Sequence, residues 1–273
     1  MAKVAGFSEI GKSAGDLLSK GFDFKNTFTL SSATGDGTKM TVKSVKDGEK
    51  LSGDIKLAKS IMGAAVDVNI SSTSKVSVTG CKSDLYPGLK ATLAANLPDH
   101  TSGKLTLDYS APHITTKAVV GLTSSPALQL STAIGTPNAI VGVDGCYDTT
   151  SSILTKWSVG TAYLSKDYSA SLLLTDKGST LKASYSHAID PTQTAACEVV
   201  RKLNSDATTF TMGYQKKLDT GATLKMRLAN SGLGAMSYSF SPAAKTTMSI
   251  SGQFDTTNLD KNSKLGMSLD VKA

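Results

Sequence analysis

Two basic residues at helical spacing are the first feature of this sequence that could do chemistry. Lys12 and Lys20 are eight residues apart. On an α-helix this separation is about two turns, or roughly 12 Å along the axis, so both ammonium groups would lie on nearly one face. Two cations placed in this way could meet the phosphate groups of a nucleotide.

Further basic residues fall at alternate positions in segments where polar and apolar residues alternate. The set is Lys90, Lys104, Lys225, Arg227 and Lys264, with Asp108 and Asp270 as its acidic members. If these positions share one face of a sheet, that face is positive and favours anions. Any solvated sheet face can carry lysines, so the prediction depends on their sum and not on one residue.

Catalytic and metal-binding groupings are not evident. His100, His113 and His187 fall in or near predicted turns and strand ends, without a serine, carboxylate or metal-ligand pattern around them. Three widely spaced cysteines argue against a disulfide framework and against a zinc site. We therefore predict that the chain is not an enzyme, and we expect no metal and no cofactor.

The composition excludes several classes of protein. The 273 residues carry a net charge of +7, which suits anionic partners but lies well below that of a dedicated nucleic-acid binder. Nucleic acid is therefore not expected as the main ligand. No apolar run reaches the 18 residues of a membrane-spanning helix, and the N-terminus does not read as a secretory signal.

The elements that must position these groups begin with a helix. Apolar residues recur at helical spacing near the N-terminus, namely Phe7, Ile10, Ala14, Leu17 and Leu18. Ser8 is placed to cap this helix, and Gly21 is placed to end it. The pattern fits an ordinary terminal helix packed on a core. Glu9 and Asp16 argue against a mitochondrial presequence, which is poor in acidic residues.

From about Lys25 onward the period changes to two, which predicts strands with one apolar and one polar face. The clearest runs cover residues 89–97, 104–109, 222–229, 246–253 and 264–271. Turn signals separate such runs at 35–37, 47–48, 176–178 and 219–221. At about 13 residues per strand and turn, the chain holds roughly nineteen antiparallel strands.

A sheet of this size must close into a barrel or split into two layers, because open edges recruit other chains. A packed sandwich needs large side chains between its layers, whereas Ala, Gly, Thr and Val are frequent at the apolar positions here. Tyr109, Tyr147, Tyr185 and Tyr214 fall near strand ends, as in an interfacial girdle. The pattern alone leaves a membrane barrel and a soluble all-β binding protein open.

Four segments identify a family. They are Phe7–Ala14 continuing to Gly21, Pro87–Lys90 with Leu97–Lys104, Asp176–Gly178 through His187, and Asp255–Ala273. With these segments in order along its full length, the chain resembles the mitochondrial voltage-dependent anion channels, the eukaryotic porins, especially their plant-type branch. This channel is known as a barrel of nineteen strands, so the strand estimate is not independent of the resemblance.

The resemblance implies an all-β, membrane-spanning barrel of about 19 strands with the N-terminal helix inside the lumen. Residues 1–25 would form the amphipathic helix and hinge, and 26–273 the barrel, with its first and last strands paired in parallel. It further implies a voltage-gated, weakly anion-selective channel of the mitochondrial outer membrane. ATP, ADP, phosphate and other small metabolites would pass through it by diffusion.

The resemblance also assigns roles to individual residues. Lys12 and Lys20 would interact with nucleotides, since the family uses lysines at matching positions in this way. Lys90, Lys225 and Arg227 join them as anion-interacting residues because of their alternation on the polar face, not because of the resemblance. Contacts to a dinucleotide would come from Leu233, Gly234, Ala235, Ser251 and Asp255. An insertion signal for the outer membrane would consist of Lys264, Gly266, Leu269 and Val271.

The expected partners are permeant nucleotides and anions, outer-membrane lipids, further copies of the chain and cytosolic kinases. Two departures from animal relatives bear on this expectation. The hinge has a single glycine, Gly21, which predicts a stiffer connection. Asp67 is the only acid in 61–79, where some relatives carry a membrane-facing glutamate for kinase docking, so hexokinase docking is not assumed. A protein-import barrel on the same scaffold stays an alternative.

Overall fold

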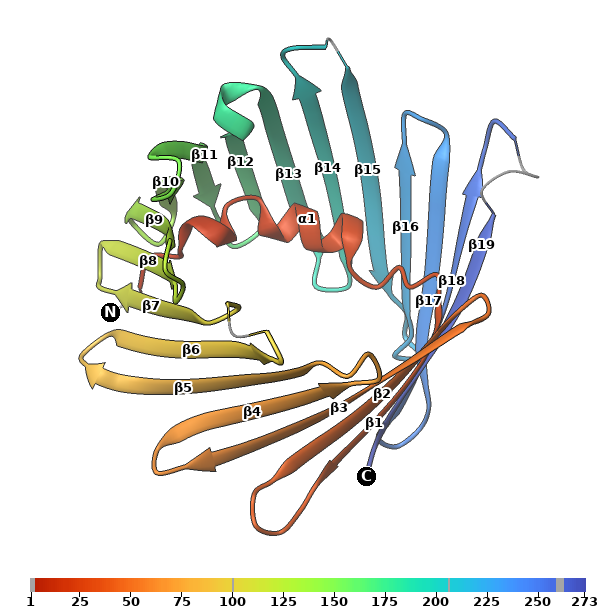
Figure 1. The fold of residues 1–273 in the computed structure, drawn as a ribbon. Coiled ribbons are helices and arrows are strands. Elements are labelled where there is room, and N and C mark those ends of the chain that lie inside the picture. The colour runs from red at the N-terminus through yellow and green to blue at the C-terminus, as the bar shows by residue number, and fades with distance from the viewer. Residues whose placement is uncertain (1–2, 100, 206, 259–262) are drawn as a thin grey trace.

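The computed structural model describes residues 3–99, 101–205, 207–258 and 263–273, so His100 lies outside the described residues. Over these residues a single sheet of nineteen strands forms a ring, with one short helix crossing its inside (Figure 1). This arrangement confirms the predicted all-β barrel with an N-terminal helix in its lumen. No helix in the described ranges is long and apolar enough to cross a membrane.

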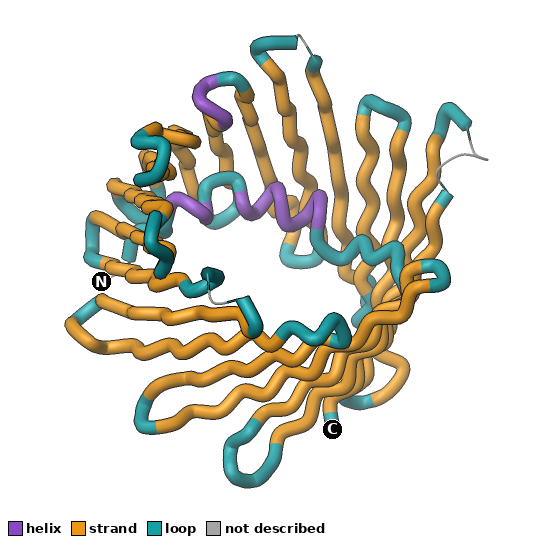
Figure 2. Tube along the Cα trace, viewed as in Figure 1, coloured by secondary structure: helices purple, strands orange, loops and turns teal. Residues whose placement is uncertain are grey.

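The strands follow one another around the ring and are joined by short turns (Figure 2). They are β1 (Asn26–Ala33), β2 (Lys39–Asp47), β3 (Lys50–Ile61), β4 (Ala64–Ser71), β5 (Val76–Tyr86), β6 (Leu89–Leu97), β7 (Lys104–Ser110), β8 (Ile114–Gly121), β9 (Ala127–Gly135), β10 (Ala139–Asp148), β11 (Ile153–Leu164), β12 (Tyr168–Thr175), β13 (Thr180–Asp190), β14 (Gln193–Lys202), β15 (Thr208–Lys217), β16 (Thr223–Ala229), β17 (Leu233–Ala243), β18 (Thr246–Asp255) and β19 (Lys264–Lys272).

The ring closes through its first and last strands. β1 pairs in parallel with β19, and Phe28 lies opposite Leu269 while Leu30 lies opposite Val271. The other neighbouring strands are antiparallel, so an odd number of strands needs this one parallel seam. Closure leaves no unpaired edge among the described strands, which removes the aggregation hazard of an open sheet.

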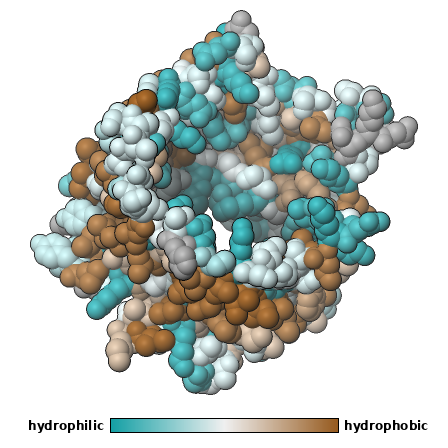
Figure 3. Space-filling model, viewed as in Figure 1, coloured by the Kyte–Doolittle hydropathy of each residue, from teal (hydrophilic) through white to brown (hydrophobic). Residues whose placement is uncertain are grey.

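The alternation seen in the sequence produces two faces. Outward-facing apolar side chains are widely exposed on the described surface, for example Leu93 at 51% and Ile134 at 57%. Figure 3 shows hydrophobic residues gathered on the outer flanks at the left and bottom of the view, and hydrophilic residues around the hollowed centre. A water-soluble sheet would bury these side chains, whereas a membrane barrel presents them to lipid.

The predicted strands and turns agree closely with the observed ones. The runs at 89–97, 104–109, 222–229, 246–253 and 264–271 correspond to β6, β7, β16, β18 and β19. Each predicted turn joins two strands, and the turn at 176–178 forms the short 3₁₀ helix η2 (Asp176–Gly178). A period of two is reliable here because every strand has one face in water and one in an apolar medium.

The predicted start of the helix is wrong. The 3₁₀ helix η1 (Phe7–Glu9) comes first, and α1 (Lys12–Ser19) begins after Gly11, whereas Ser8 makes no capping hydrogen bond. Gly11 has φ +74°, and a Cβ atom there would lie 3.0 Å from Ser171 Oγ. The chain therefore breaks at Gly11 because it must pass very close to the barrel wall, which only glycine permits.

Candidate functional site: the barrel lumen

Contacts between the N-terminal segment and the wall show which face of each strand lines the lumen. Lys225 and Arg227 on β16 reach the helix, and Ser251 on β18 donates a hydrogen bond to the Gly21 carbonyl at 3.4 Å. Side chains alternate between the two faces along a strand, and residues paired across neighbouring strands point to the same face. The strand registers therefore show, strand by strand around the ring, which residues face the lumen.

Basic side chains outnumber acidic ones on the described lumen face. The basic residues are Lys39, Lys43, Lys50, Lys56, Lys90, Lys104, Lys117, Lys156, Lys182, Lys202, Lys217, Lys225, Arg227, Lys264 and Lys272. The acidic residues are Asp47, Asp54, Asp67, Asp108, Asp144, Asp148, Glu198, Asp255 and Asp270. Charged groups of both signs attract water to this face, and the excess of cations makes the electrostatic potential in the lumen positive.

The residues that precede the helix are held on the inner side of β8–β10. Val4 and Ile10 are buried against Ala133 and Ile140, and Thr115 Oγ1 donates a hydrogen bond to the Val4 carbonyl at 2.7 Å. A Cβ atom on Gly142 would lie 2.9 Å from the Phe7 ring. Small residues on these strands thus make room for a segment that packs flat against the wall.

Helix α1 lies across β13–β15 and buries its apolar stripe against that part of the wall (Figure 1). Leu17 and Leu18 are 6% and 5% exposed and pack with Ala196. Gly213 lies directly beneath them, since a Cβ atom there would be 2.6 Å from Leu18 Cδ2 and 2.9 Å from Leu17 Cδ2. The apolar periodicity therefore predicted the buried helix face correctly, but the recess at Gly213 was missed.

Hydroxyl groups fix the other end of the helix. Ser13 Oγ forms a hydrogen bond with Ser186 Oγ at 2.9 Å and a second one with Ser169 Oγ. Ser169 and Ser186 are themselves joined at 2.8 Å across β12 and β13. A polar contact at Ser13 and an apolar contact at Leu17 and Leu18 thus hold one face of the helix along its length.

Lys225 and Arg227 bind the C-terminal end of the helix and do not project freely into the lumen. Arg227 Nη1 donates to the Leu18 carbonyl at 2.9 Å, and Lys225 Nζ donates to the Lys20 carbonyl at 3.2 Å. These carbonyls have no intrahelical donor, and the negative end of the helix dipole attracts cations. The Arg227 guanidinium also lies 4.9 Å from the centroid of the Phe22 ring.

Lys12 and Lys20 lie on the lumen side of the helix, and each pairs with an acidic residue of the same segment. Lys12 Nζ lies 2.6 Å from Glu9 Oε1, and Lys20 Nζ lies 2.8 Å from Asp16 Oδ2. The hydrogen bond to Glu9 raises the pKa of Lys12 above its ordinary value of 10.5. Both lysine side chains stay well exposed, at 44% and 65%, so solutes in the lumen can reach them.

Lys90 occupies a row of alternating charges on the opposite part of the wall. It lies across from Asp108 on β7, which in turn lies across from Lys117 on β8. Among the described residues, none of the three forms an ion pair within 4.0 Å. Their side chains are therefore available to solutes in the lumen.

The five residues named for dinucleotide contacts do not share one accessible surface. Ala235 and Ser251 are 2% and 1% exposed on the lumen side, near the hinge at Gly21. Leu233 and Asp255 pair near the rim, whereas Gly234 belongs to the outward face beside the Phe254 ring. The chain itself therefore covers Ala235 and Ser251, so a ligand in the lumen cannot reach these two residues in this arrangement.

Gly266, from the C-terminal motif, has a structural position that spacing alone could not reveal. A Cβ atom there would lie 2.4 Å from the Asp23 carbonyl oxygen and 2.5 Å from the Lys25 nitrogen. The hinge backbone therefore runs directly over Gly266. Leu269 and Val271 face outward at the seam, and Lys264 lies at the exposed start of β19.

Asp67 belongs to the lumen face. It lies across from Thr79 on β5, and its Oδ2 atom lies 2.9 Å from Lys56 Nζ, with which it forms an ion pair. Its carboxylate is thus turned away from the lipid-facing side, which leaves the described side chains of 61–79 without an outward-facing acid.

A closed barrel with an apolar outer wall, a charged lumen and a helix docked inside defines a membrane-spanning β-barrel pore. The family model described as "Eukaryotic porin" matches residues 4–266. The chain therefore belongs to the eukaryotic porin family. Because this is a family of non-enzymatic porins, the match confirms the prediction that the chain is not an enzyme.

Curated relatives agree with the family over nearly the whole length. The chain is 35% identical to mitochondrial outer membrane protein porin 4 of Arabidopsis thaliana, covering 98% of both chains. It is 37% identical to mitochondrial outer membrane protein porin 6 of Oryza sativa subsp. japonica, again over 98% of both. The outer plastidial membrane protein porin of Pisum sativum is 32% identical over 97% of both.

A solved structure of a bacterial porin shares the barrel architecture. A double mutant of the Rhodopseudomonas blastica porin superposes with a TM-score of 0.50 over 85% of this chain and 90% of that chain. The sequence identity is 10%, so this likeness concerns the fold alone.

Proposed function

We propose that this chain is a passive channel of the mitochondrial outer membrane with a weak preference for anions. The observation that carries the proposal is the excess of basic side chains on the lumen face. Fixed cations on a pore wall favour anions, and a wide lumen discriminates only weakly. The mitochondrial relatives support this location, and the plastidial relative points to the alternative, the outer membrane of a plastid.

The permeants would be ATP, ADP, phosphate and other small metabolites. The exposed ammonium groups of Lys12 and Lys20 lie on the docked helix, and Lys90 lies on the opposite wall. A nucleotide passing between them would meet cations on both sides. Lys225 and Arg227 would act indirectly, because their donors are bound to the helix carbonyls.

Voltage gating requires charge that moves through the membrane field, at about 2.3 kcal/mol per elementary charge per 100 mV. We propose that residues 1–25 are the moving part and that 26–273 form the fixed barrel. Residues 1–25 carry four lysines (Lys3, Lys12, Lys20 and Lys25) and three acids (Glu9, Asp16 and Asp23), a net charge of +1. Apolar contacts of Leu17 and Leu18 with the wall hold this segment in place.

A planar-bilayer recording across a salt gradient tests the anion preference. The refolded full chain should conduct, with a reversal potential on the anion-selective side. Cation preference together with binding of basic presequence peptides would favour a protein-import barrel. A soluble, monodisperse product that does not conduct would favour a soluble all-β protein.

Charge reversal tests the role of the two helix lysines. Lys12→Glu together with Lys20→Glu should lower ATP flux into liposomes more than the flux of a neutral sugar. Lys245→Glu, in the turn between β17 and β18, is the matched control and should leave both fluxes unchanged. Equal losses of ATP and sugar flux in the double variant would contradict the assignment.

A further inference from the structure

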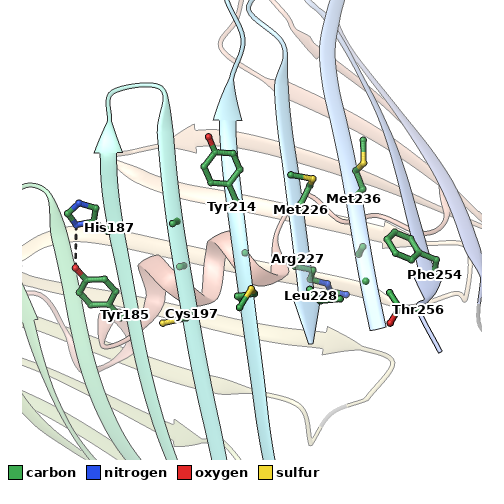
Figure 4. A pocket seen from close by; sticks show the side chains of 16 residues that line it. Tyr185, His187, Cys197, Tyr214, Met226, Arg227, Leu228, Met236, Phe254 and Thr256 are labelled. Atoms are coloured by element: carbon green, nitrogen blue, oxygen red, sulfur yellow. Dashed lines mark hydrogen bonds between the residues drawn. The ribbon is translucent and has the colours of Figure 1, made fainter. Parts of the chain in front are cut away.

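The outward face of β13–β18 contains a groove of about 610 Å³, seen from the lipid side in Figure 4. Two adjacent rows of outward side chains line it, each crossing the strands in register. Small residues form its floor, including Ala195, Cys197 and Gly234, and methionines rise beside them. Arg227 also lines the groove, but its guanidinium points into the lumen, where it donates a hydrogen bond to the Leu18 carbonyl.

The groove descends from one end of the barrel toward the other. At one extreme, His187 lies near the end of β13 (Asp190). At the other, Leu228 and Gly234 flank the turn between β16 and β17, at the opposite ends of the strands. Rows across strands run obliquely because the strands of a barrel are tilted by about 35–45°. The groove therefore follows membrane depth, as a lipid chain does.

Four aromatic rings lie at the end of the groove marked by His187. We call this set the Tyr/His row: Tyr163, Tyr168, Tyr185 and His187. Neighbouring ring centroids are 5.9, 6.3 and 6.2 Å apart. The Tyr185 hydroxyl and His187 Nδ1 are 3.3 Å apart and hydrogen-bonded. Tyr163 and Tyr168 flank the turn that joins β11 to β12, so the row lies where the wall meets the membrane interface.

The chemistry of this surface selects one kind of occupant. The groove belongs to the lipid-facing wall, and none of its described lining side chains points a fixed charge outward. Methionine walls adapt to a flexible acyl chain. At the polar end, tyrosine rings attract a quaternary ammonium group, while a hydroxyl or imidazole N–H can donate to a phosphate or ester oxygen.

We propose that the groove and the Tyr/His row form a binding site for one phospholipid with a choline head group. The choline lies against the faces of Tyr168 and Tyr185, and one acyl chain fills the groove as far as Phe254. Among the described lining residues, Arg227 turns its guanidinium to the lumen, so an anionic head group would find no outward-facing cation in the groove. The turn beside the Tyr/His row carries Lys166 next to Asp167, which together add no net charge. This site is separate from the lumen and does not depend on which solutes the pore conducts.

Native mass spectrometry of the refolded, delipidated full chain tests the proposal. Dioleoyl-phosphatidylcholine, dioleoyl-phosphatidylethanolamine, dioleoyl-phosphatidylglycerol and a sterol are added separately at equal concentration. We expect one copy of the choline lipid to be retained most tightly. Equal retention of the choline and ethanolamine lipids, or tighter retention of the glycerol lipid or the sterol, would overturn the proposal.

Two variants locate the site. Tyr168→Leu with Tyr185→Leu should weaken binding of the choline lipid by about tenfold, the loss expected for a desolvated cation–π contact. Tyr86→Leu, an outward tyrosine on β5 that is 64% exposed, is the matched control and should bind as the wild type does. An equal effect of the control and the double variant would contradict the site.

A third variant tests the groove independently of the rings. Ala195→Phe places a large side chain on the floor of the groove and should abolish retention, whereas Val141→Phe on the outward face of β10 should not. Unchanged single-channel conductance shows that each barrel is folded. If the double tyrosine variant does not fold, Ala195→Phe and the comparison of lipid classes decide, and retention by Ala195→Phe would refute the proposal.

Discussion

Gly213 is the position where adding a side chain should separate the helix from the barrel wall. Its missing Cβ leaves the recess for Leu17 and Leu18, with the would-be atom 2.6 Å from Leu18 Cδ2. Gly213→Val therefore cannot be accommodated while the helix stays docked. Valine itself is well suited to a strand, so the barrel should still form.

The size of the effect follows from the contacts that are lost. Overpacking a tight contact costs about 1–3 kcal/mol. Complete exposure of the two leucines would cost about 1.5–3 kcal/mol each, so partial lifting of the helix is the cheaper response. A change of about 1–3 kcal/mol corresponds to a 5- to 150-fold shift toward the undocked state.

A nitroxide label at Ser19, in a cysteine-free background, reports on this shift. The line shape in Gly213→Val should become that of a mobile label, whereas it stays immobilised in the parent. Gly80→Val is the matched control, because a Cβ atom at Gly80 has no neighbour within 4 Å. An immobile label in Gly213→Val, or equal mobility in both variants, would refute the packing argument.

Three further predictions concern the helix end, the seam and pH. Arg227→Gln removes the charged hydrogen bond to the Leu18 carbonyl and should loosen the helix end by about 1.5–3 kcal/mol, measured as faster label motion; unchanged motion would contradict it. Gly266→Ala places a methyl group against the hinge backbone and should lower the yield of folded barrel in a refolding gel, and a normal yield would show that the hinge can shift. Glu9 raises the pKa of Lys12 above the ordinary 10.5, so Lys12 loses its charge only as pH rises through that higher pKa. Anion preference should therefore persist when pH is raised from 7 to about 9.5, and Glu9→Gln should lower the pH at which Lys12 loses its proton, as followed by NMR of the lysine side chain.

The barrel could be predicted from the sequence because its main physical signal is local. Each strand has one side toward water and one toward lipid, so polar and apolar residues alternate, and Leu89–Leu97 is the clearest case. Turn residues then mark the strand ends. The estimate of roughly nineteen strands came from the chain length per strand and agreed with the family resemblance. The parallel seam came with the resemblance alone, since it does not follow from alternation.

The site could be predicted only in part, because its contacts join residues that are far apart in the chain. The alternation indicated that Arg227 faces the lumen side, but not that it binds the Leu18 carbonyl 209 residues away. Gly213 and Gly266 read as ordinary strand glycines until the helix and hinge are placed over them. A glycine at a lumen-facing position, among polar neighbours, is the signal that could have suggested such close approach.

The outer groove left no mark that sequence reasoning could use. Its lining residues are apolar and outward-facing like the rest of the wall, and only their sizes in register across β13–β18 create a depression. Register between strands is a property of the folded sheet and is not set by any one segment.

Cysteine accessibility tests the two-faced wall most directly. In a cysteine-free background, Thr92→Cys and Leu93→Cys place a thiol on adjacent residues of β6 that face opposite sides. With the protein in liposomes or a planar bilayer, a charged, membrane-impermeant thiosulfonate should modify Thr92→Cys and reduce the current, and it should leave Leu93→Cys unmodified. Rapid modification of Leu93→Cys with protection of Thr92→Cys would contradict a lipid-facing apolar side and a water-filled lumen.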